Sequence, residues 1–341
     1  MPPKTASTKP PVPSPLLTYP IKSHADAMQS TIVKPPEVVE GLLLKQTATL
    51  VSALPHGMKS LSWLAACLQA PTTHRVWGHF DASKVSRTLF IETEDPEWMV
   101  EARIRGLTRG LPLEARNGEG FQYWCPGPFD LVSQTEELKK RIRDSGADFV
   151  VLSTLQNLLH GRNMNKQDEM ASVMEAILSI TREVCPLSVI THSPWNERSR
   201  RAYGAVTQTA NFLTTLHYRK MMNTRTKETF AHVLLDSKAG GEDSSFHLKL
   251  TTEGNPKDPA SVRSILYGGE GWPKGIGKEN VLAILEEDPG LSAEEVAERS
   301  GVSKRYVNKL ISDGNGKKRK TDAQQMKPLD FLAAGKGGKP S

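Results

Sequence analysis

The residues that decide the fold are ATLVSALPHGMKSLSWLAACLQA, from Ala48 to Ala70. A nearly continuous apolar run at 48–54 predicts a strand that is buried on both faces. The loop PHGMKS follows, and apolar residues then recur with helical spacing at Leu61, Leu64, Ala65 and Leu68. A strand, a short loop and a helix that opens with Lys-Ser form the context in which backbone amides and a helix N-terminus bind phosphate.

The phosphate-loop motif GxxxxGK[ST] is only half present in this stretch. Ala53 stands at its first glycine and Met58 at its second, while Gly57 comes one position early. Met58 must therefore adopt a turn that glycine normally takes, and its Cβ is expected to crowd a phosphate. The residues expected to contact a nucleotide are Pro55, His56, Gly57, Met58, Lys59, Ser60 and Leu61. The alternative is an ordinary helix start, since Lys-Ser is common there.

Three further apolar runs predict strands: RTLFIET at 87–93, DFVVLST at 148–154 and LSVIT at 187–191. They alternate with helical patterns, which favours an α/β fold with a parallel sheet covered by helices. After residue 211 the runs FLTTLHY, TFAHVLLD and SFHLKLT alternate in polarity. These runs predict an antiparallel extension that makes the sheet mixed. Asp95 and Pro96 are expected to be the N-cap and the first residue of the helix after the second strand.

Composition limits the classes of protein to consider. The chain has 341 residues, too many for one small module, and a net charge of +6. The excess lies at the ends, because residues 37–313 hold 33 basic and 35 acidic side chains. Three scattered cysteines support neither a disulfide framework nor a zinc cluster. With no apolar run of 18 residues and no signal-peptide pattern, we expect a cytoplasmic protein without a membrane segment.

The same counts divide the chain into five segments. Nine of the 23 prolines fall in residues 1–36, which predicts a disordered tail. The α/β domain is expected at 37–252, a Gly- and Pro-rich linker with one strand or turn at 253–278, a helical domain at 279–313 and a basic disordered tail at 314–341. The apolar patch PLDFLAA in the last segment is either a docking motif or simply part of the tail.

Residues 279–313 contain three short helical patterns. Ser292 and Glu295 form a capping box at the start of the second helix. A turn then leads to a third helix, and the arrangement predicts an all-α helix-turn-helix whose last helix enters the major groove of DNA. The side chains expected to contact DNA are Lys304, Arg305, Asn308 and Lys309. The alternative is that these helices serve only for oligomerisation.

Taken in order, four stretches resemble the RecA-like P-loop ATPases of the RepA and DnaB helicase type, in the bacterial and phage branch of the AAA family. They are VVEGLLLKQTATLVSALPHGMKSLSWLAACLQA, TLFIETEDPEWMVEARIRGL, ADFVVLSTLQNLL and SVITHSPWN, and the resemblance covers residues 36–252. It implies a RecA-like sheet flanked by helices, with ATP and Mg²⁺ as cofactors. The nucleotide-binding (Walker) motifs are degenerate here.

The resemblance also assigns roles to single residues. It implies that Glu94 polarises the attacking water, and Glu92 is expected on the same strand face at period two. The alternative is that Glu94 and Asp95 only cap the next helix. His192 matches the position of a residue that senses the terminal phosphate, with an ordinary histidine at a strand end as the alternative.

For the metal, the family pairs a Ser in the phosphate loop with an aspartate at the end of the third strand. Here Ser60 and Ser153 take these places. A neutral hydroxyl is a poorer partner for Mg²⁺ than a carboxylate, so weak turnover is expected.

Relatives also carry basic residues that reach a neighbouring subunit's nucleotide, which implies a homo-oligomeric ring such as a hexamer. The matching positions here are Asp236 and Lys238, so Lys238 alone keeps the charge, with Arg219 and Lys220 as substitutes. The loop HGRNMNKQD is a further candidate for contact with single-stranded nucleic acid in such a ring.

Two functions remain open on these grounds. The first is a RecA-like ATP-binding protein that acts on DNA in replication, as a helicase or in a mobile element, and hydrolyses ATP weakly. The alternative is a non-catalytic DNA-binding regulator or adaptor with a decayed nucleotide site, as the residues Ala53, Met58, Ser153 and Asp236 suggest.

Overall fold

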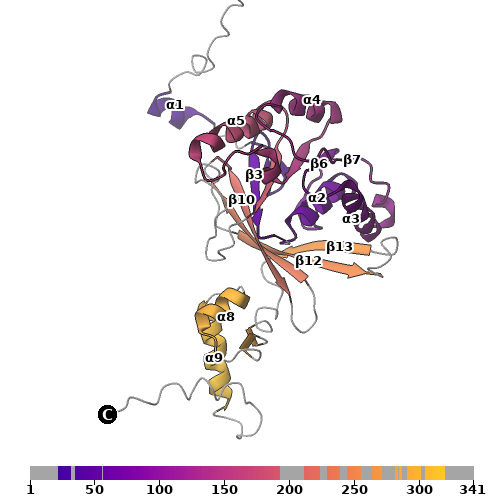
Figure 1. Cartoon of the computed structure of the whole chain (residues 1–341). Helices are drawn as coiled ribbons and strands as arrows, with labels where there is room; N and C mark the ends of the chain where they lie inside the picture. Colours follow the sequence, from indigo (N-terminus) through magenta and orange to yellow (C-terminus); the bar gives the residue numbers. More distant parts are fainter. Residues whose placement is uncertain are drawn as a thin grey trace, which may run out of the picture. The chain divides into compact units, whose positions relative to one another are not determined.

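The computed structural model (Figure 1) describes residues 22–31, 35–55, 57–192, 211–222, 229–238, 244–254, 263–270, 281–282, 284–285, 290–300 and 304–318. The chain divides into two compact units, Met1–Pro35 and Pro36–Ser341. The first unit contains α1 (His24–Gln29), which Ser23 and Asp26 cap reciprocally. This short helix forms inside the tail that the proline content predicted to be disordered, and none of its residues is buried.

A nine-stranded mixed sheet forms the centre of the second unit. Its order is β13-β12-β11-β10-β3-β9-β8-β6-β7. The parallel part comprises β3 (Ala48–Ala53), β6 (Thr88–Glu92), β7 (Phe121–Trp124), β8 (Phe149–Ser153), β9 (Leu187–His192) and β10 (Thr214–Met222). The antiparallel part adds β11 (Thr229–Ser237), β12 (Ser244–Glu253) and β13 (Arg263–Glu270). The predicted mixed sheet, its four parallel strands and its antiparallel extension are confirmed.

Some short strands escaped sequence analysis. The edge strand β7 has only four residues, and none of them is fully buried, so its apolar pattern is weak. Two small sheets were also missed. They consist of β1 (Glu37–Val39) with β2 (Leu43–Leu44), and β4 (Arg75–Val76) with β5 (Phe80–Asp81).

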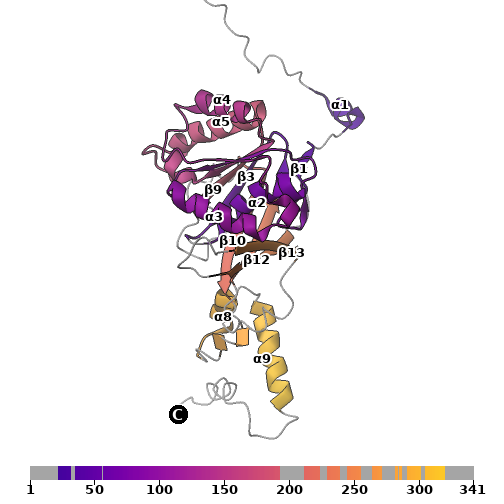
Figure 2. The same cartoon turned by 90° about the vertical axis from the view of Figure 1, so that its right-hand side faces the viewer.

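Helices cover both faces of the central sheet (Figure 2). They are α2 (Lys59–Thr73), α3 (Glu97–Gly110), α4 (Thr135–Ser145) and α5 (Gln167–Glu183), with 3₁₀ turns at Leu113–Ala115 and Leu155–Leu158. Strand β3 contributes Val51 to the apolar core shared with α2 and α3, and Leu50 to the separate core shared with α4 and α5. This alternation is why β3 reads as a continuous apolar run in the sequence.

Helix α3 begins one residue later than predicted. Pro96 is its N-cap and Glu97 its first residue, so the expectation that Asp95 caps the helix is wrong. The carboxylate of Asp95 instead accepts a hydrogen bond from Nη1 of Arg103 on the same helix, at 2.5 Å. A charged partner of this kind competes with the backbone amides for the same oxygens.

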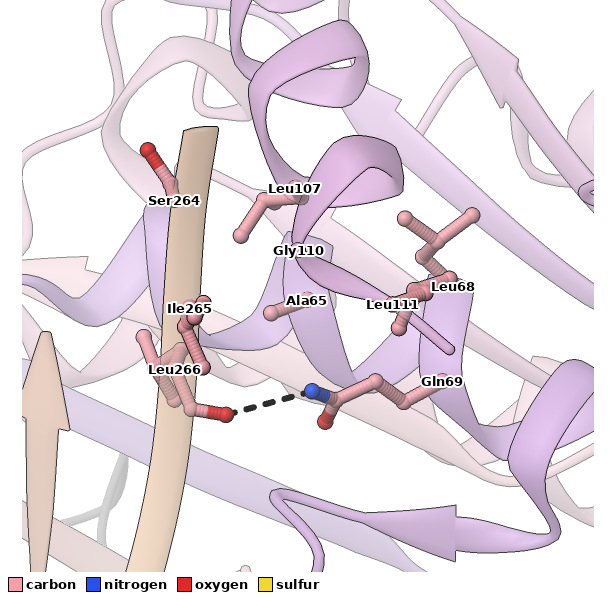
Figure 3. A pocket seen from close by; sticks show the side chains of 9 residues that line it. All are labelled: Ala65, Leu68, Gln69, Leu107, Gly110, Leu111, Ser264, Ile265 and Leu266. Carbon is pink, nitrogen blue, oxygen red and sulfur yellow. Dashed lines mark hydrogen bonds between the residues drawn. The ribbon is translucent and has the colours of Figure 1, made fainter. Parts of the chain in front are cut away.

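Strand β13 lies inside the segment 253–278 that the sequence assigned to a linker with one strand or turn. It packs closely on α3, because a Cβ added at Gly110 would lie 2.1 Å from the carbonyl oxygen of Ser264. Gln69 of α2 donates to the carbonyl of Leu266 at 3.2 Å (Figure 3). It also accepts a hydrogen bond from the amide of Trp77 at 2.7 Å. The cavity between these elements is about 20 Å³, enough for one water.

The C-terminal helices share a separate small core. Helices α8 (Ala293–Ser300) and α9 (Lys304–Lys318) bury Val281, Leu285, Val296, Ala297 and Val307. The predicted capping box is confirmed: the amide of Ser292 donates to Glu295, and the amide of Glu295 to the Ser292 hydroxyl. Helix α9 runs five residues past the domain end predicted at 313. Within the described ranges, no helix combines the length and apolarity that crossing a membrane requires.

Replacing Gly110 with Ala is expected to lower the free energy of unfolding by about 2 kcal/mol, because the new methyl group must displace the β13 backbone. Urea denaturation measures this change. The control is Gly41→Ala, where φ is +70° but nothing lies within 4 Å of the added Cβ. The free energy of unfolding of this control should fall by about 1 kcal/mol, because alanine disfavours the left-handed conformation. Equal losses in the two variants would contradict the packing argument.

Candidate functional site

The loop between β3 and α2 is tightly wound. The amide of Gly57 donates to the carbonyl of Leu54 at 3.0 Å. A Cβ at Gly57 would lie 2.7 Å from the Cβ of Ala53, so glycine is required here by close approach. Met58 has φ of 67°, the left-handed conformation that the sequence motif demands of this position.

The Met58 side chain packs into the apolar core. It is 9% exposed and belongs to the apolar core shared with α2. Leu61 packs against the same core, and Pro55 lies in the turn before it, while His56 falls outside the described residues. Among the described side chains, none caps the first turn of α2 by a hydrogen bond. Its amides are therefore available to an anion.

Three predicted site residues meet at the carboxyl ends of three strands. Nζ of Lys59, which follows β3, lies 3.0 Å from Nδ1 of His192 at the end of β9. Nε2 of His192 lies 3.7 Å from Oε2 of Glu94, which follows β6. The sequence predicted each of these residues separately, and the parallel sheet brings them together.

Burial and charge act in opposite directions within this cluster. Lys59 is only 5% exposed, and burial lowers the pKa of its ammonium, while the nearby charge of Glu94 opposes this shift most strongly. The pKa of Glu94 is lowered chiefly by its hydrogen bond with His192, against the effect of partial burial. Glu94 is therefore an anion at neutral pH and able to accept a proton or orient water.

Glu92 and Glu94 do not share a strand face as expected, because the strand ends at Glu92, although the charges of both act on Lys59. Strand β6 ends at Glu92, which is 1% exposed. Its Oε1 accepts hydrogen bonds from the amides of Thr93, Glu94 and Asp95 at 3.0, 2.9 and 3.4 Å. Burial raises the pKa of this carboxyl, and the amides of Glu94 and Asp95 partly offset the shift. The turn leaving the sheet needs an acceptor for these amides, and Glu92 supplies it.

The capping alternative for Glu94 and Asp95 receives no support. Within the part of the chain that the structure describes, no side chain caps the N-terminus of α3. Asp95 pairs with Arg103, and Glu94 faces His192. Glu94 lies at the edge of the cluster, where its side chain is about half exposed.

The two predicted metal ligands are neighbours. Oγ of Ser153, at the end of β8, lies 3.2 Å from Oγ of Ser60 in the first turn of α2. Ser153 is fully buried. The described ranges contain no group of three His, Cys, Asp or Glu side chains able to hold a metal ion by themselves. A cation here would therefore need phosphate oxygens as additional ligands, as is usual for Mg²⁺.

Lys238 does not join this cluster within its own chain. It follows Ser237, which pairs with Thr214, and Thr214 pairs with Thr49 near the start of β3. Lys59 follows the opposite end of the same strand. Lys238 therefore lies near the amino end of β3, opposite to the end that carries the phosphate loop, and it is exposed.

The other basic residues considered from sequence have different positions. Arg219 and Lys220 come directly after Tyr218, which pairs with Ala53, so they lie at the same edge as the phosphate loop. In the polar loop after β8, Arg162 forms an ion pair with Asp130 at 2.6 Å, and Lys166 with Glu169 at 2.8 Å. Intramolecular pairing does not favour these two as nucleic-acid contacts.

Sequence reasoning missed a buried network beneath the phosphate loop. The hydroxyl of Ser62 donates to the carbonyl of Lys59 at 2.9 Å and is hydrogen-bonded to the hydroxyl of Tyr218 at 3.2 Å. Nε1 of Trp77 donates to the carbonyl of Ser62 at 2.8 Å. These contacts fix the first turn of α2. The sequence pattern predicted only a strand here, and the pairing of β10 with β3 is what places Tyr218 beside the loop.

The four side chains predicted to contact DNA all lie on α9. Lys304, Arg305, Asn308 and Lys309 are all exposed, whereas Val307 on the same helix is buried. Nζ of Lys304 lies 2.8 Å from Oε2 of Glu294 on α8, so part of its charge is already paired.

A family model described as an AAA domain matches residues 13–198, more than half of the chain. The protein belongs to the AAA domain family. The matched region contains Lys59, Glu94, Ser153 and His192, so the site lies in a P-loop ATPase-like domain. The expected RecA-like α/β fold is confirmed by this match together with the nine-stranded sheet.

A second model, described as a winged helix-turn-helix DNA-binding domain, matches residues 278–313. The predicted C-terminal helix-turn-helix is thus confirmed. No curated protein matches the chain. The AAA protein therefore combines an ATP-binding domain with a DNA-binding module, and an AAA domain implies nucleotide binding with Mg²⁺.

The residues present fit such a nucleotide. The uncapped first turn of α2 and the Lys59 ammonium suit phosphate oxygens, and the paired hydroxyls of Ser60 and Ser153 suit a hard cation. Glu94 lies beyond them as an anion within reach of His192.

Met58 should be more tolerant of glycine than of alanine. Both replacements lose the buried side chain, which costs about 2 kcal/mol, but only glycine also relieves the left-handed backbone, by about 1 kcal/mol. Met58→Gly is thus expected to be about 1 kcal/mol more stable than Met58→Ala in urea denaturation. The reverse order would mean that φ at this position does not limit stability.

Proposed function

We propose that this AAA protein binds ATP with Mg²⁺ at the loop before α2 and hydrolyses it slowly while docked on duplex DNA through α9. The contact of Lys59 with His192, and of His192 with Glu94, is the observation that carries this proposal. Lys59 as the phosphate-binding cation, His192 as the candidate sensor and Glu94 as the candidate base lie together at the carboxyl ends of the parallel strands. Phosphoryl transfer requires such a combination of groups.

Each chain residue has a defined part in this proposal. The Lys59 ammonium gives up His192 Nδ1 and pairs with phosphate oxygens, which restores a partner to a buried cation. His192, then free to turn to the terminal phosphate, remains in contact with Glu94, which orients the attacking water. Ser60 and Ser153 would hold Mg²⁺, which would neutralise developing negative charge on the phosphates. Ser153, a hydroxyl where relatives carry a carboxylate, is the reason to expect slow turnover.

We further propose that the protein assembles as a homo-oligomeric ring of the RepA and DnaB helicase type and acts in DNA replication or in a mobile element in the cytoplasm. Support comes from the position of Lys238, exposed at the sheet edge remote from its own Lys59. A basic residue in this position can act on a nucleotide only in another subunit. The RecA-like fold supplies the architecture that such rings use.

Lys59→Ala should lower kcat/KM for ATP by at least about 100-fold, because a preorganised cation at the phosphates is lost. Hydrolysis is measured with and without duplex DNA, and Lys45→Ala serves as the control for removal of an exposed lysine. Equal hydrolysis by wild type and Lys59→Ala, with no nucleotide binding by either, would favour the non-catalytic regulator or adaptor.

His192→Ala should move the acid limb of the pH profile of kcat/KM upward. The hydrogen bond with His192 lowers the pKa of Glu94 from its ordinary 4.5, so wild-type Glu94 stays ionised below that pH. Without the bond, Glu94 takes up its proton at higher pH. The same interaction stabilises the fold above the unfolded pKa, and this contribution is lost as pH falls through the folded pKa. An unmoved acid limb, with fluorescence showing folded protein, would contradict the assignment.

Arg305→Ala and Lys309→Ala should each weaken DNA binding and reduce the slope of log K against log salt by about 1. Lys304→Ala should change the slope less, because Glu294 already pairs with this ammonium. Fluorescence anisotropy with a labelled duplex at several salt concentrations measures the slopes. Unchanged DNA binding in the Arg305 and Lys309 variants, with an altered oligomeric state, would favour the oligomerisation alternative.

A further inference from the structure

The carboxylate missing from the end of β8 has a neighbour of the right chemistry on the next strand. Glu92 and Ser153 are register partners, the last residues of β6 and β8, which run parallel and adjacent in the sheet. Side chains at paired positions of neighbouring strands project to the same face and lie within contact distance. The carboxylate of Glu92 therefore stands one strand away from the position at which a carboxylate was expected.

The contacts of Ser153 connect this carboxylate to the predicted metal position. Glu92 and Ser153 are register partners, and the Ser153 hydroxyl favours the charged form of Glu92, although burial raises the pKa of this carboxyl more strongly. The same hydroxyl lies 3.2 Å from Oγ of Ser60. Glu92 and Ser153 are both at least 99% buried, so water screens their interaction little. A continuous polar path thus runs from Glu92 through Ser153 to Ser60.

The positive charge near Glu92 is shared, so Glu92 lacks a counter-charge of its own. Its Oε1 accepts three backbone amides, and the Lys59 ammonium, whose charge acts on Glu92, interacts more strongly with Glu94 and contacts His192. Backbone amides carry partial charges only, and burial of a carboxylate is costly unless a cation or enough donors meet it. A divalent cation beside Ser60 would provide this missing charge.

We propose that Glu92 replaces the missing carboxylate of β8: acting through the Ser153 hydroxyl, it provides the negative charge that holds Mg²⁺ at Ser60. Glu92 is thus a positioning residue for the cation, and Ser153 is the relay between the two. The inference rests on the proposed function. In this proposal Glu92 and Ser153 together replace the single carboxylate expected at the end of β8. Glu92 on β6 provides the charge, and Ser153 on β8 provides the hydroxyl.

The test measures binding of the fluorescent analogue mant-ATP at increasing Mg²⁺ concentrations and in EDTA. In the wild type, Mg²⁺ should strengthen binding. Glu92→Gln should lose at least about 10-fold of this gain while binding in EDTA stays the same, because an amide oxygen still accepts the loop amides but carries no charge. Electron paramagnetic resonance of Mn²⁺ with ATP provides a second readout, in which bound Mn²⁺ should fall in the variant.

Three further variants distinguish charge from loop structure. Adding Ser153→Asp to Glu92→Gln should restore the response to Mg²⁺, since it returns a carboxylate to β8. Ser153→Ala, which leaves the loop contacts of Glu92 in place, should lose the response as Glu92→Gln does. Glu101→Gln should keep it, because Glu101 pairs with Arg105 on α3 and lies outside the nucleotide cluster.

The outcomes separate this inference from the proposed function. If Glu92→Gln and Ser153→Ala bind mant-ATP with the wild-type response to Mg²⁺, Glu92 only holds the loop amides and the inference is overturned alone. If the double variant stays as weak as Glu92→Gln, charge relocation is likewise overturned. If the wild type binds no mant-ATP at any Mg²⁺ concentration, the proposed function fails and takes the inference with it.

Discussion

The site depends on the burial of one ammonium group. Lys59 is almost inaccessible to water, yet it stands at the first residue of α2, where the helix dipole disfavours a cation. Such a group stays charged only if acceptors and anions surround it, and His192 and Glu94 fill this place. The free-energy cost of burying this charge falls when a polyanion binds beside it. The surroundings of Lys59 therefore favour a bound phosphate group.

The fold holds that ammonium in place by means far from it. Strand β3 lies between β9 and β10, so one neighbour delivers His192 and the other delivers Tyr218 beneath the loop. Trp77 joins this network and also stacks on Phe246 of β12. The antiparallel half of the sheet, which bears none of the proposed contacts to the nucleotide of its own chain, therefore helps to fix the first turn of α2.

Sequence reasoning worked where a local signal existed. The apolar runs of β3, β6, β8 and β9 located these strands, and three of the residues predicted at their carboxyl ends, Lys59, Glu94 and His192, lie together in the structure. It failed where a tertiary contact overrode a local rule. Asp95 is a residue type that often caps helices, but its carboxylate pairs with Arg103. Glu92 lies two positions before Glu94, but its carboxylate accepts hydrogen bonds from the backbone amides of the following turn.

The sequence by itself determined the strands, the phosphate-loop helix and the C-terminal helical unit, because periodicity and capping residues act over a few positions of the chain. Strand order and register were decided only in the tertiary structure. They place His192 against Lys59, Glu92 beside Ser153 and Lys238 near the amino end of β3. The physical reason is that pairing between strands joins residues far apart in the chain, and the free energy of these contacts depends on burial and charge that no local pattern records.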